Sequence, residues 1–264
     1  MELVTLKMKI STQIIGKLYK MKLVVVSAFW NASDYIDKCI TSVKNQNFTD
    51  FSMYLIDDMS TDDTVEKIKK LIIGDDRFKL IINSTKKYKL RNFDELIIDD
   101  SLIDDEDVII ELDGDDWLFD NNVLQKIYDR YTNNKNLWMT NGSFIYSNGM
   151  IGFSSKVNPS SVRTDPFRLS HLRTWKSHLW RSIEEESFIG PDGEYFRSAP
   201  DVAYSFPMVE MAGLKHYEFI PDLMYVYNAE SPYNEHKPNS SDGGLQSQSN
   251  NANFIRSMKP YRPL

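Results

Sequence analysis

Four short runs of apolar residues recur in the first 120 positions, and segments with helical hydrophobic spacing separate them. The runs cover residues 22–26, 51–56, 78–82 and 108–112. The first run is continuous over residues 23–26, which is typical of a strand buried on both faces of a sheet, and the other three runs also predict strands. Helical spacing occurs between them, at Ile36/Cys39/Ile40/Val43, at Val65/Ile68/Leu71/Ile72 and more weakly at Leu96, Ile97 and Leu102. This alternation predicts an α/β fold with a mostly parallel sheet and right-handed crossovers.

The second half of the chain has a less regular pattern. Val123, Leu124, Ile127 and Tyr131 share one helical face, and Asn121 or Asn122 is suited to cap that helix. Strands are expected at residues 137–140, 144–146, 217–220 and 223–227, with turns at Asn141-Gly142 and Asn148-Gly149. Residues 158–173 are polar and interrupted by proline, which predicts a loop, and residues 174–183 fit a short strand or helix. A helix is expected over 203–212, ended by Gly213 and kinked or shortened by Pro207.

Composition and charge exclude several classes of protein. The net charge of −7 over 264 residues argues against a nucleic-acid binder of the usual basic kind. The single cysteine, Cys39, lies on the apolar face of its helix and permits neither an internal disulfide nor a cysteine zinc site. No stretch approaches the roughly 20 apolar residues of a membrane span. A soluble protein in a reducing, cytoplasmic setting is the default expectation.

Three carboxylates, Asp113, Asp115 and Asp116, directly follow the fourth apolar run. In open α/β sheets ligands bind beyond the carboxyl ends of the strands. Carboxylates this close repel one another, and a hard divalent cation such as Mg²⁺ or Mn²⁺ relieves the repulsion. Asp113-Gly114 also suits a hairpin turn, so a plain acidic loop is the alternative. The chain has neither the G-x-G-x-x-G pattern of a dinucleotide fold nor a P-loop.

Three stretches, taken in order, resemble family 2 glycosyltransferases of the GT-A fold. They are Val24-Val25-Val26-Ser27-Ala28-Phe29-Trp30-Asn31-Ala32-Ser33-Asp34-Tyr35-Ile36, Leu55-Ile56-Asp57-Asp58-Met59-Ser60-Thr61-Asp62-Asp63-Thr64 and Leu112-Asp113-Gly114-Asp115-Asp116-Trp117-Leu118. The second is close to the family pattern V-D-D-G-S-T-D-x-T and the third to L-D-x-D-D-W. Lys89-Leu90-Arg91-Asn92 falls where the family often has A-R-N. The order and spacing of these matches, rather than any one of them, carry the resemblance.

The resemblance implies a single GT-A domain in which a mostly parallel nucleotide-binding sheet, flanked by helices, precedes a loop-rich acceptor half. The expected parts are an N-terminal extension over 1–20, a nucleotide-sugar-binding half over 21–120, an acceptor and catalytic half over 121–236 and a mobile tail over 237–264. The implied activity is that of an inverting, metal-dependent glycosyltransferase of the hexosyltransferase type.

For the donor, the resemblance implies that Asp58 accepts a hydrogen bond from the nucleobase ring N–H. Uracil offers such a donor, so a UDP-sugar is favoured, although guanine also offers one. Ala28 and Trp30 match positions beside the base and ribose, and Arg91 matches a position near the base or diphosphate. Helix capping by Asp58 and an ordinary surface position for Arg91 are the alternatives.

The family's DXD cluster corresponds to Asp113 and Asp115, with Asp116 beside them and Gly114 between. In the family this cluster holds Mn²⁺ or Mg²⁺ against the donor diphosphate. The ion neutralises charge on the leaving nucleotide, which is Lewis-acid catalysis.

The family also has an acidic residue just before a helix, followed by an I-P-x-x-L-Y-x-Y strand. Pro200-Asp201 and the later segment 220–227 match this arrangement, so the resemblance makes Asp201 the general base. Helix capping by Asp201 is the alternative. Trp175, His178 and Trp180 are candidates for the acceptor side, because aromatic faces stack on sugars.

Two other functional classes stay open. A non-catalytic GT-A-like module that binds a nucleotide or glycan is one, and a nucleotidyltransferase is the other. The acceptor hydroxyl could belong to a glycan, a lipid-linked sugar, a protein side chain or a modified nucleic acid.

Overall fold

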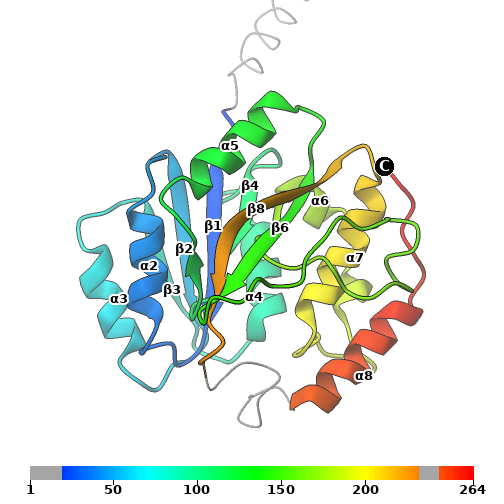
Figure 1. The fold of residues 1–264 in the computed structure, drawn as a ribbon. Helices are drawn as coiled ribbons and strands as arrows, with labels where there is room; N and C mark the ends of the chain where they lie inside the picture. Colours follow the sequence, from blue (N-terminus) through cyan, green and yellow to red (C-terminus); the bar gives the residue numbers. More distant parts are fainter. Residues whose placement is uncertain (1–19, 232–243) are drawn as a thin grey trace, which may run out of the picture.

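The computed structural model describes residues 20–231 and 244–264, which form one sheet flanked by helices (Figure 1). The eight strands lie in the order β3-β2-β1-β4-β7-β6-β8-β5. They are β1 (Leu23–Phe29), β2 (Phe51–Asp57), β3 (Phe78–Ile82), β4 (Val108–Glu111), β5 (Trp117–Leu118), β6 (Met139–Tyr146), β7 (Thr174–Lys176) and β8 (Tyr217–Tyr227). The first four strands pair in parallel, which confirms the predicted α/β architecture.

Two hydrophobic clusters cover the two faces of the sheet. The helices are α2 (Ile36–Lys44), α3 (Thr64–Ile72), α4 (Tyr88–Ile97), α5 (Val123–Asn133), α6 (Ser177–Arg181), α7 (Pro200–Ala212) and α8 (Gly244–Ser257), with a 3₁₀ turn η1 (Glu185–Phe188). Successive residues of a strand point to opposite faces. Val25 therefore packs in the cluster that contains α2, α3 and α5, and Val26 packs in the cluster that contains α4, α6 and α7. Within the described residues, no helix combines the length and apolar character needed to cross a membrane.

Strand β6 runs straight through Asn141-Gly142, where a turn was expected. It pairs with β8 along its whole length, and shifts in register beside Ser143 absorb the irregularity. A Cβ on Gly142 would lie 2.7 Å from Cε of Met224, so glycine here permits close packing rather than a turn. Strand β8 is likewise continuous through Pro221, where two separate strands were expected.

Helix α7 continues past Pro207 to Ala212, so the expected shortening is wrong. Nearly every residue of the helix is buried. Packing on all sides therefore holds the helix despite the missing backbone N–H of proline. Helix α4 ends at Ile97, so Leu102, which is exposed, is not part of it.

The C-terminal segment is docked rather than mobile over residues 244–264. Figure 1 shows α8 next to α7, and Ile255 of α8 is 1% exposed. Arg163 forms a buried pair with Glu210 of α7 and donates to the backbone oxygen of Ile255. The backbone N–H of Tyr261 donates to the same glutamate. Buried contacts of this kind oppose the disorder that a Ser/Asn/Gln-rich composition suggested. The rest of the predicted tail, 237–243, and the N-terminal extension over 1–19 lie outside the described residues.

Candidate active site

The loops that follow β1, β2 and β4 meet at one edge of the sheet. The first two are tied together, because the N–H of Asn31 donates to Oγ of Ser60 at 2.9 Å. The third packs closely on the first. A Cβ on Gly114 would lie 2.6 Å from Cβ of Phe29, a distance that real Cβ atoms do not show. Glycine at the centre of the acidic cluster is therefore required by packing against the end of β1.

Asp113 and Asp116 lie with His171 in a group whose oxygen and nitrogen atoms are all within 4.8 Å of one another. Asp116 is held in place by Tyr225, whose hydroxyl donates to it at 2.6 Å, and by the backbone N–H of Asn228 at 2.7 Å. The ring of His171 stacks on Tyr225 with centroids 4.3 Å apart. Its Nδ1 is buried and has no hydrogen-bond partner among the described residues.

The electrostatics of this group favour a cation. Burial raises the pKa of Asp116 well above its ordinary value, and the charges of Asp115 and Asp113 add to the shift. Burial also raises the pKa of Asp115, whose side chain bonds to Ser231. Burial and then Arg173 hold the pKa of His171 well below its usual range, so the ring is neutral. Two carboxylates and a neutral imidazole with a free nitrogen are a suitable donor set for Mn²⁺, and less so for Mg²⁺, which prefers oxygen.

Glu111, the last residue of β4, is the centre of a buried ion network. It is 0% exposed, and Arg173 binds both its oxygens, at 2.5 and 2.8 Å. The hydroxyl of Tyr204 donates to it at 2.7 Å, and Nζ of Lys89 lies 2.5 Å from Oε1. Burial alone would raise the pKa of Glu111, but Arg173 and Lys89 hold it well below its ordinary value. The carboxylate therefore stays ionised inside the protein.

The network ends at Asp201 on one side and at Asp113 on the other. Asp201 lies in the first turn of α7, and its Oδ2 is 3.8 Å from Nη1 of Arg173. Its side chain is 28% exposed. Burial raises the pKa of Asp201, whereas the Arg173 guanidinium opposes the rise. Lys89 contacts Asp113 directly. A partly exposed carboxylate with a raised pKa is suited to accept a proton near neutral pH.

Of the predicted donor residues, Asp58 is already engaged. Its carboxylate accepts hydrogen bonds from Asn83 Nδ2 at 2.9 Å and from the backbone N–H groups of Lys87 and Tyr88 at 2.8 Å. It is 4% exposed. These bonds hold the start of α4 against the end of β2. Asp58 therefore acts as a helix-capping residue, which was the alternative to a contact with the nucleobase. The contact of Asp58 with a nucleobase stays a prediction.

The other predicted donor residues lie around this edge without converging on the carboxylates. Ala28 is partly buried near the end of β1, and Trp30 has Nζ of Lys86 3.7 Å from its ring centroid. Arg91 pairs with Glu95, one turn along α4, and its side chain is 48% exposed. Lys89, and not Arg91, is the basic residue of α4 that reaches the acidic cluster.

Two of the three acceptor-side candidates are buried in the core. Trp175 and Trp180 are 0% and 1% exposed in the core, where both rings pack against Tyr204 in a tilted arrangement, with centroids 5.4 and 5.2 Å from it. The Nε1 of Trp180 donates to Asp94 at 2.9 Å. His178 packs on Trp138, and its backbone N–H bonds to Asp105, which precedes β4. His178 is therefore at the opposite end of β4 from the acidic cluster. The burial of Trp175 and Trp180 corrects their expected role, and the role of His178 stays a prediction.

Sequence reasoning missed four residues that meet at this site: Lys89, Glu111, His171 and Arg173. One signal was available for Glu111, since a carboxylate inside a buried apolar strand requires a cationic partner. Lys89 lies two positions before the arginine that the motif singled out. His171 and Arg173 come from an irregular loop whose path no local pattern predicts.

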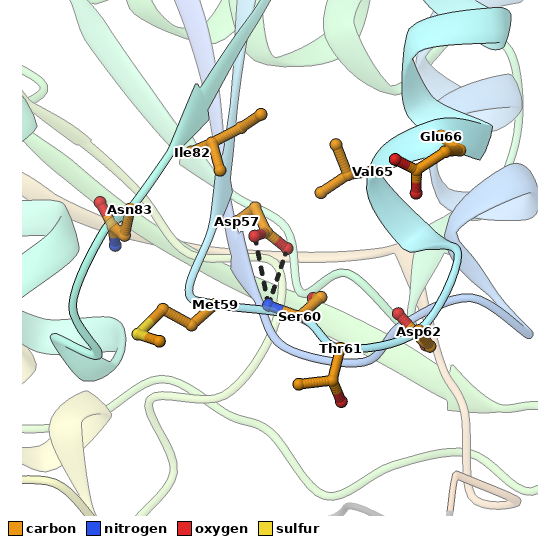
Figure 2. A pocket seen from close by; sticks show the side chains of 9 residues that line it. All are labelled: Asp57, Met59, Ser60, Thr61, Asp62, Val65, Glu66, Ile82 and Asn83. Atoms are coloured by element: carbon orange, nitrogen blue, oxygen red, sulfur yellow. Dashed lines mark hydrogen bonds between the residues drawn. The ribbon is translucent and has the colours of Figure 1, made fainter.

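A separate cavity of about 380 Å³ opens at the carboxyl ends of β2 and β3, beside the start of α3 (Figure 2). Asp57 lies in its wall, and its carboxylate accepts the backbone N–H of Ser60 at 3.2 Å. This bond shapes the loop after β2. None of the predicted donor, metal or base residues lines this cavity.

The family model described as "Glycosyl transferase family 2" matches residues 24–181. The chain is 36% identical over 66 residues to the Campylobacter jejuni protein named GalNAc(5)-diNAcBac-PP-undecaprenol beta-1,3-glucosyltransferase, which is 25% of this chain and 21% of that protein.

Two solved structures share the fold. S. aureus TarS 1–349 in complex with UDP-GlcNAc superposes with a TM-score of 0.61 at 18% identity, over 80% of this chain and 59% of TarS 1–349. The mannosyltransferase PcManGT from Pyrobaculum calidifontis, in complex with GDP-Man and Mn²⁺, has a TM-score of 0.54 at 13% identity, over 84% of this chain and 64% of that one. The chain thus spans less than two thirds of the length of each of these relatives.

Proposed function

This chain belongs to glycosyl transferase family 2, and from that premise we propose that it transfers a sugar from a UDP-sugar to an acceptor hydroxyl with inversion at the anomeric carbon. It is a glycosyltransferase with a GT-A fold. The observation that carries the proposal is the ion network from Asp113 to Asp201, which joins a candidate metal group to a candidate base.

The choice of a uridine nucleotide rests on Asp58, which is positioned at the end of β2 next to the loop after β1. A carboxylate has about four acceptor positions, and the three bonds from Asn83, Lys87 and Tyr88 leave one for the N3–H of uracil. The structure of TarS with UDP-GlcNAc supports this choice, whereas the complex of PcManGT with GDP-Man keeps guanine as the competing base.

The metal fits the residues present, because the neutral ring of His171 lies beside two carboxylates and its buried Nδ1 has no hydrogen-bond partner in the described part of the chain. Asp113, Asp116 and His171 would hold the ion. Asp115 is outside that group, and burial, with a smaller contribution from the charge of Asp113, raises the pKa of its carboxyl. A bound Mn²⁺ supplies Lewis-acid neutralisation of the charge on the leaving diphosphate.

The chemical step is proposed to depend on Asp201. The acceptor oxygen forms a bond to the anomeric carbon, the bond from that carbon to the diphosphate oxygen breaks, and the hydroxyl proton passes to the Asp201 carboxylate. Attack from the face opposite the diphosphate inverts the carbon. Arg173, 3.8 Å away, favours the ionised form of Asp201 before the step.

The test is a screen of UDP-, GDP- and TDP-sugars for binding and hydrolysis with Mn²⁺ or Mg²⁺. We expect a UDP-sugar to be cleaved with Mn²⁺, and we expect Asp113→Asn to lose both metal binding and cleavage. Asp129→Asn is the matched control, since Asp129 only accepts a bond from Gln125 on the surface of α5. Nucleotide binding with no transfer to any acceptor would favour the non-catalytic alternative, and preference for a GDP-sugar would correct the donor.

A further inference from the structure

The ammonium group of Lys89 lies among the acidic residues of the proposed metal site. Its Nζ contacts Oδ1 of Asp113 directly and lies 2.5 Å from Oε1 of Glu111. The side chain of Lys89 is 21% exposed, so both contacts are partly shielded from water. Burial would lower the pKa of this ammonium group, but Asp113 and Glu111 raise it above its ordinary value, so it is charged. The positively charged side chain of Lys89 therefore already pairs with Asp113, one of the carboxylates of the proposed metal group.

The two contacts of Lys89 differ in how firmly they are held. Glu111 is wholly buried, and Arg173 and Tyr204 fix its carboxylate. Asp113 lies in the loop after β4, with a side chain that is 25% exposed. Moving the ammonium group away from Asp113 leaves Glu111 fully paired, whereas moving it away from Glu111 would remove a cation from a buried anion. Asp113 is therefore the contact that Lys89 gives up first.

A divalent ion and Lys89 require the same carboxylate. Asp113 belongs to the group with Asp116 and His171 that would bind the ion, and two cations at one carboxylate group repel each other. We propose that Lys89 is an internal cation that holds Asp113 until a divalent ion displaces it, and that it couples metal binding to binding of the donor diphosphate. This inference rests on the proposed function for the identity of the ligands.

Metal and diphosphate binding are coupled because the ammonium group of Lys89, once displaced from Asp113, remains close to the metal group. It still pairs with Glu111 and therefore stays beside the metal group, but it no longer pairs with Asp113. A nucleoside diphosphate bound to the ion offers phosphate oxygens as a new partner. The diphosphate thus offsets the cost of displacement, so metal and nucleotide each strengthen binding of the other, as linkage requires.

The test measures Mn²⁺ binding by electron paramagnetic resonance of the free ion, with and without UDP. Without UDP, Lys89→Met is expected to bind Mn²⁺ about 10-fold more tightly than the wild type, because the competing cation is gone. The gain in Mn²⁺ affinity that UDP produces is expected to shrink by about 10-fold in the same variant. Lys89→Arg keeps the charge and is expected to resemble the wild type.

Lys87→Met is the matched control. Lys87 lies two residues earlier, just before α4, but its Nζ pairs with Glu95 at the surface. Its backbone N–H, which bonds to Asp58, is unaffected by the substitution. This variant is expected to bind Mn²⁺ like the wild type. Circular dichroism confirms folding, and Lys89→Gln replaces Lys89→Met in every comparison if the methionine variant does not fold.

Unchanged or weaker Mn²⁺ binding in folded Lys89→Met would overturn the proposal, and so would an undiminished effect of UDP. Failure of the proposed function is a different result. Tighter Mn²⁺ binding in Lys89→Met with no sugar transfer by the wild type would reject the transferase mechanism and keep the role of Lys89. Sugar transfer by the wild type, together with equal Mn²⁺ affinities of the wild type and Lys89→Met, would reject the role of Lys89 and keep the transferase mechanism. Absence of Mn²⁺ binding in every variant would reject the role of Lys89.

Discussion

Nη1 of Arg173 lies 3.8 Å from Oδ2 of Asp201, while the same guanidinium binds both oxygens of Glu111. The side chain of Arg173 is 2% exposed, so its charge acts in a poorly screened environment. It therefore links the proposed base on α7 to the strand that carries the acidic cluster. Removing its charge should change both the stability of the protein and the protonation of Asp201.

Arg173→Gln is expected to move the acid limb of the pH–rate profile to higher pH. The guanidinium opposes the rise that burial causes in the pKa of Asp201, so its loss leaves the base ionised only at higher pH. The variant should also lose about 3–5 kcal/mol of unfolding free energy, because Glu111 is left without its buried partner. The measurements are kcat/KM against pH and unfolding by urea.

Arg163→Gln is the control for that experiment. Arg163 forms a comparably buried pair with Glu210, away from the acidic cluster. It should cost similar stability, yet its pH–rate profile should coincide with that of the wild type. If the two variants gave the same profile, the electrostatic role of Arg173 would be rejected.

Asp201→Asn should lower kcat by roughly 100-fold or more, because an amide cannot accept the acceptor proton. Binding of UDP and Mn²⁺ should be unchanged, since Asp201 is not part of the metal group. Single-turnover transfer and calorimetry measure the two properties. A fall in UDP affinity without a fall in kcat would instead assign Asp201 to donor binding.

His171→Phe should weaken Mn²⁺ binding by roughly 10-fold or more while the ring still stacks on Tyr225. His216→Phe is a matched control, because His216 stacks on Trp138 with centroids 3.6 Å apart, outside the metal group. Titration of both variants with Mn²⁺ measures the two affinities. Equal Mn²⁺ affinity in the two would exclude His171 as a ligand.

Gly114→Ala should destabilise the fold by about 1–3 kcal/mol, since the new Cβ would lie 2.6 Å from Cβ of Phe29 and the backbone must shift. The same shift would move Asp113 and Asp115 on either side of it. A lower melting temperature together with weaker Mn²⁺ binding is expected. A variant with the melting temperature of the wild type would show that the loop relaxes freely.

Mn²⁺ should stabilise the protein more at high pH than at low pH. Because burial raises the pKa of Asp116 and Asp115, ionising them costs stability as pH rises, and a bound ion removes that cost. At low pH the carboxylates are protonated and the ion must displace protons. The shift in melting temperature caused by Mn²⁺ should therefore grow as the pH rises above the ordinary aspartate pKa of about 3.9. A constant shift would contradict this.

The local pattern of the sequence was sufficient to predict the elements of the first half of the chain. Strands β1 to β4 and helices α2 and α3 agree with expectation, because short apolar runs and helical apolar spacing are local signals of burial. The acidic cluster was also placed correctly beyond a strand end, since Asp113 directly follows a buried strand in the chain.

The partners in the site were decided only by the tertiary structure. Arg173 and Tyr204 reach Glu111 across 62 and 93 residues of sequence, and His171 arrives by a loop without periodicity. Trp175 and Trp180 show the same limit, since an aromatic side chain suits a core as well as a sugar-binding face and only its burial separates the two. Sequence alone therefore determined strands β1 to β4 and the place where the carboxylates gather. The packing of distant segments determined which cations meet those carboxylates, because charge pairing depends on distance in space.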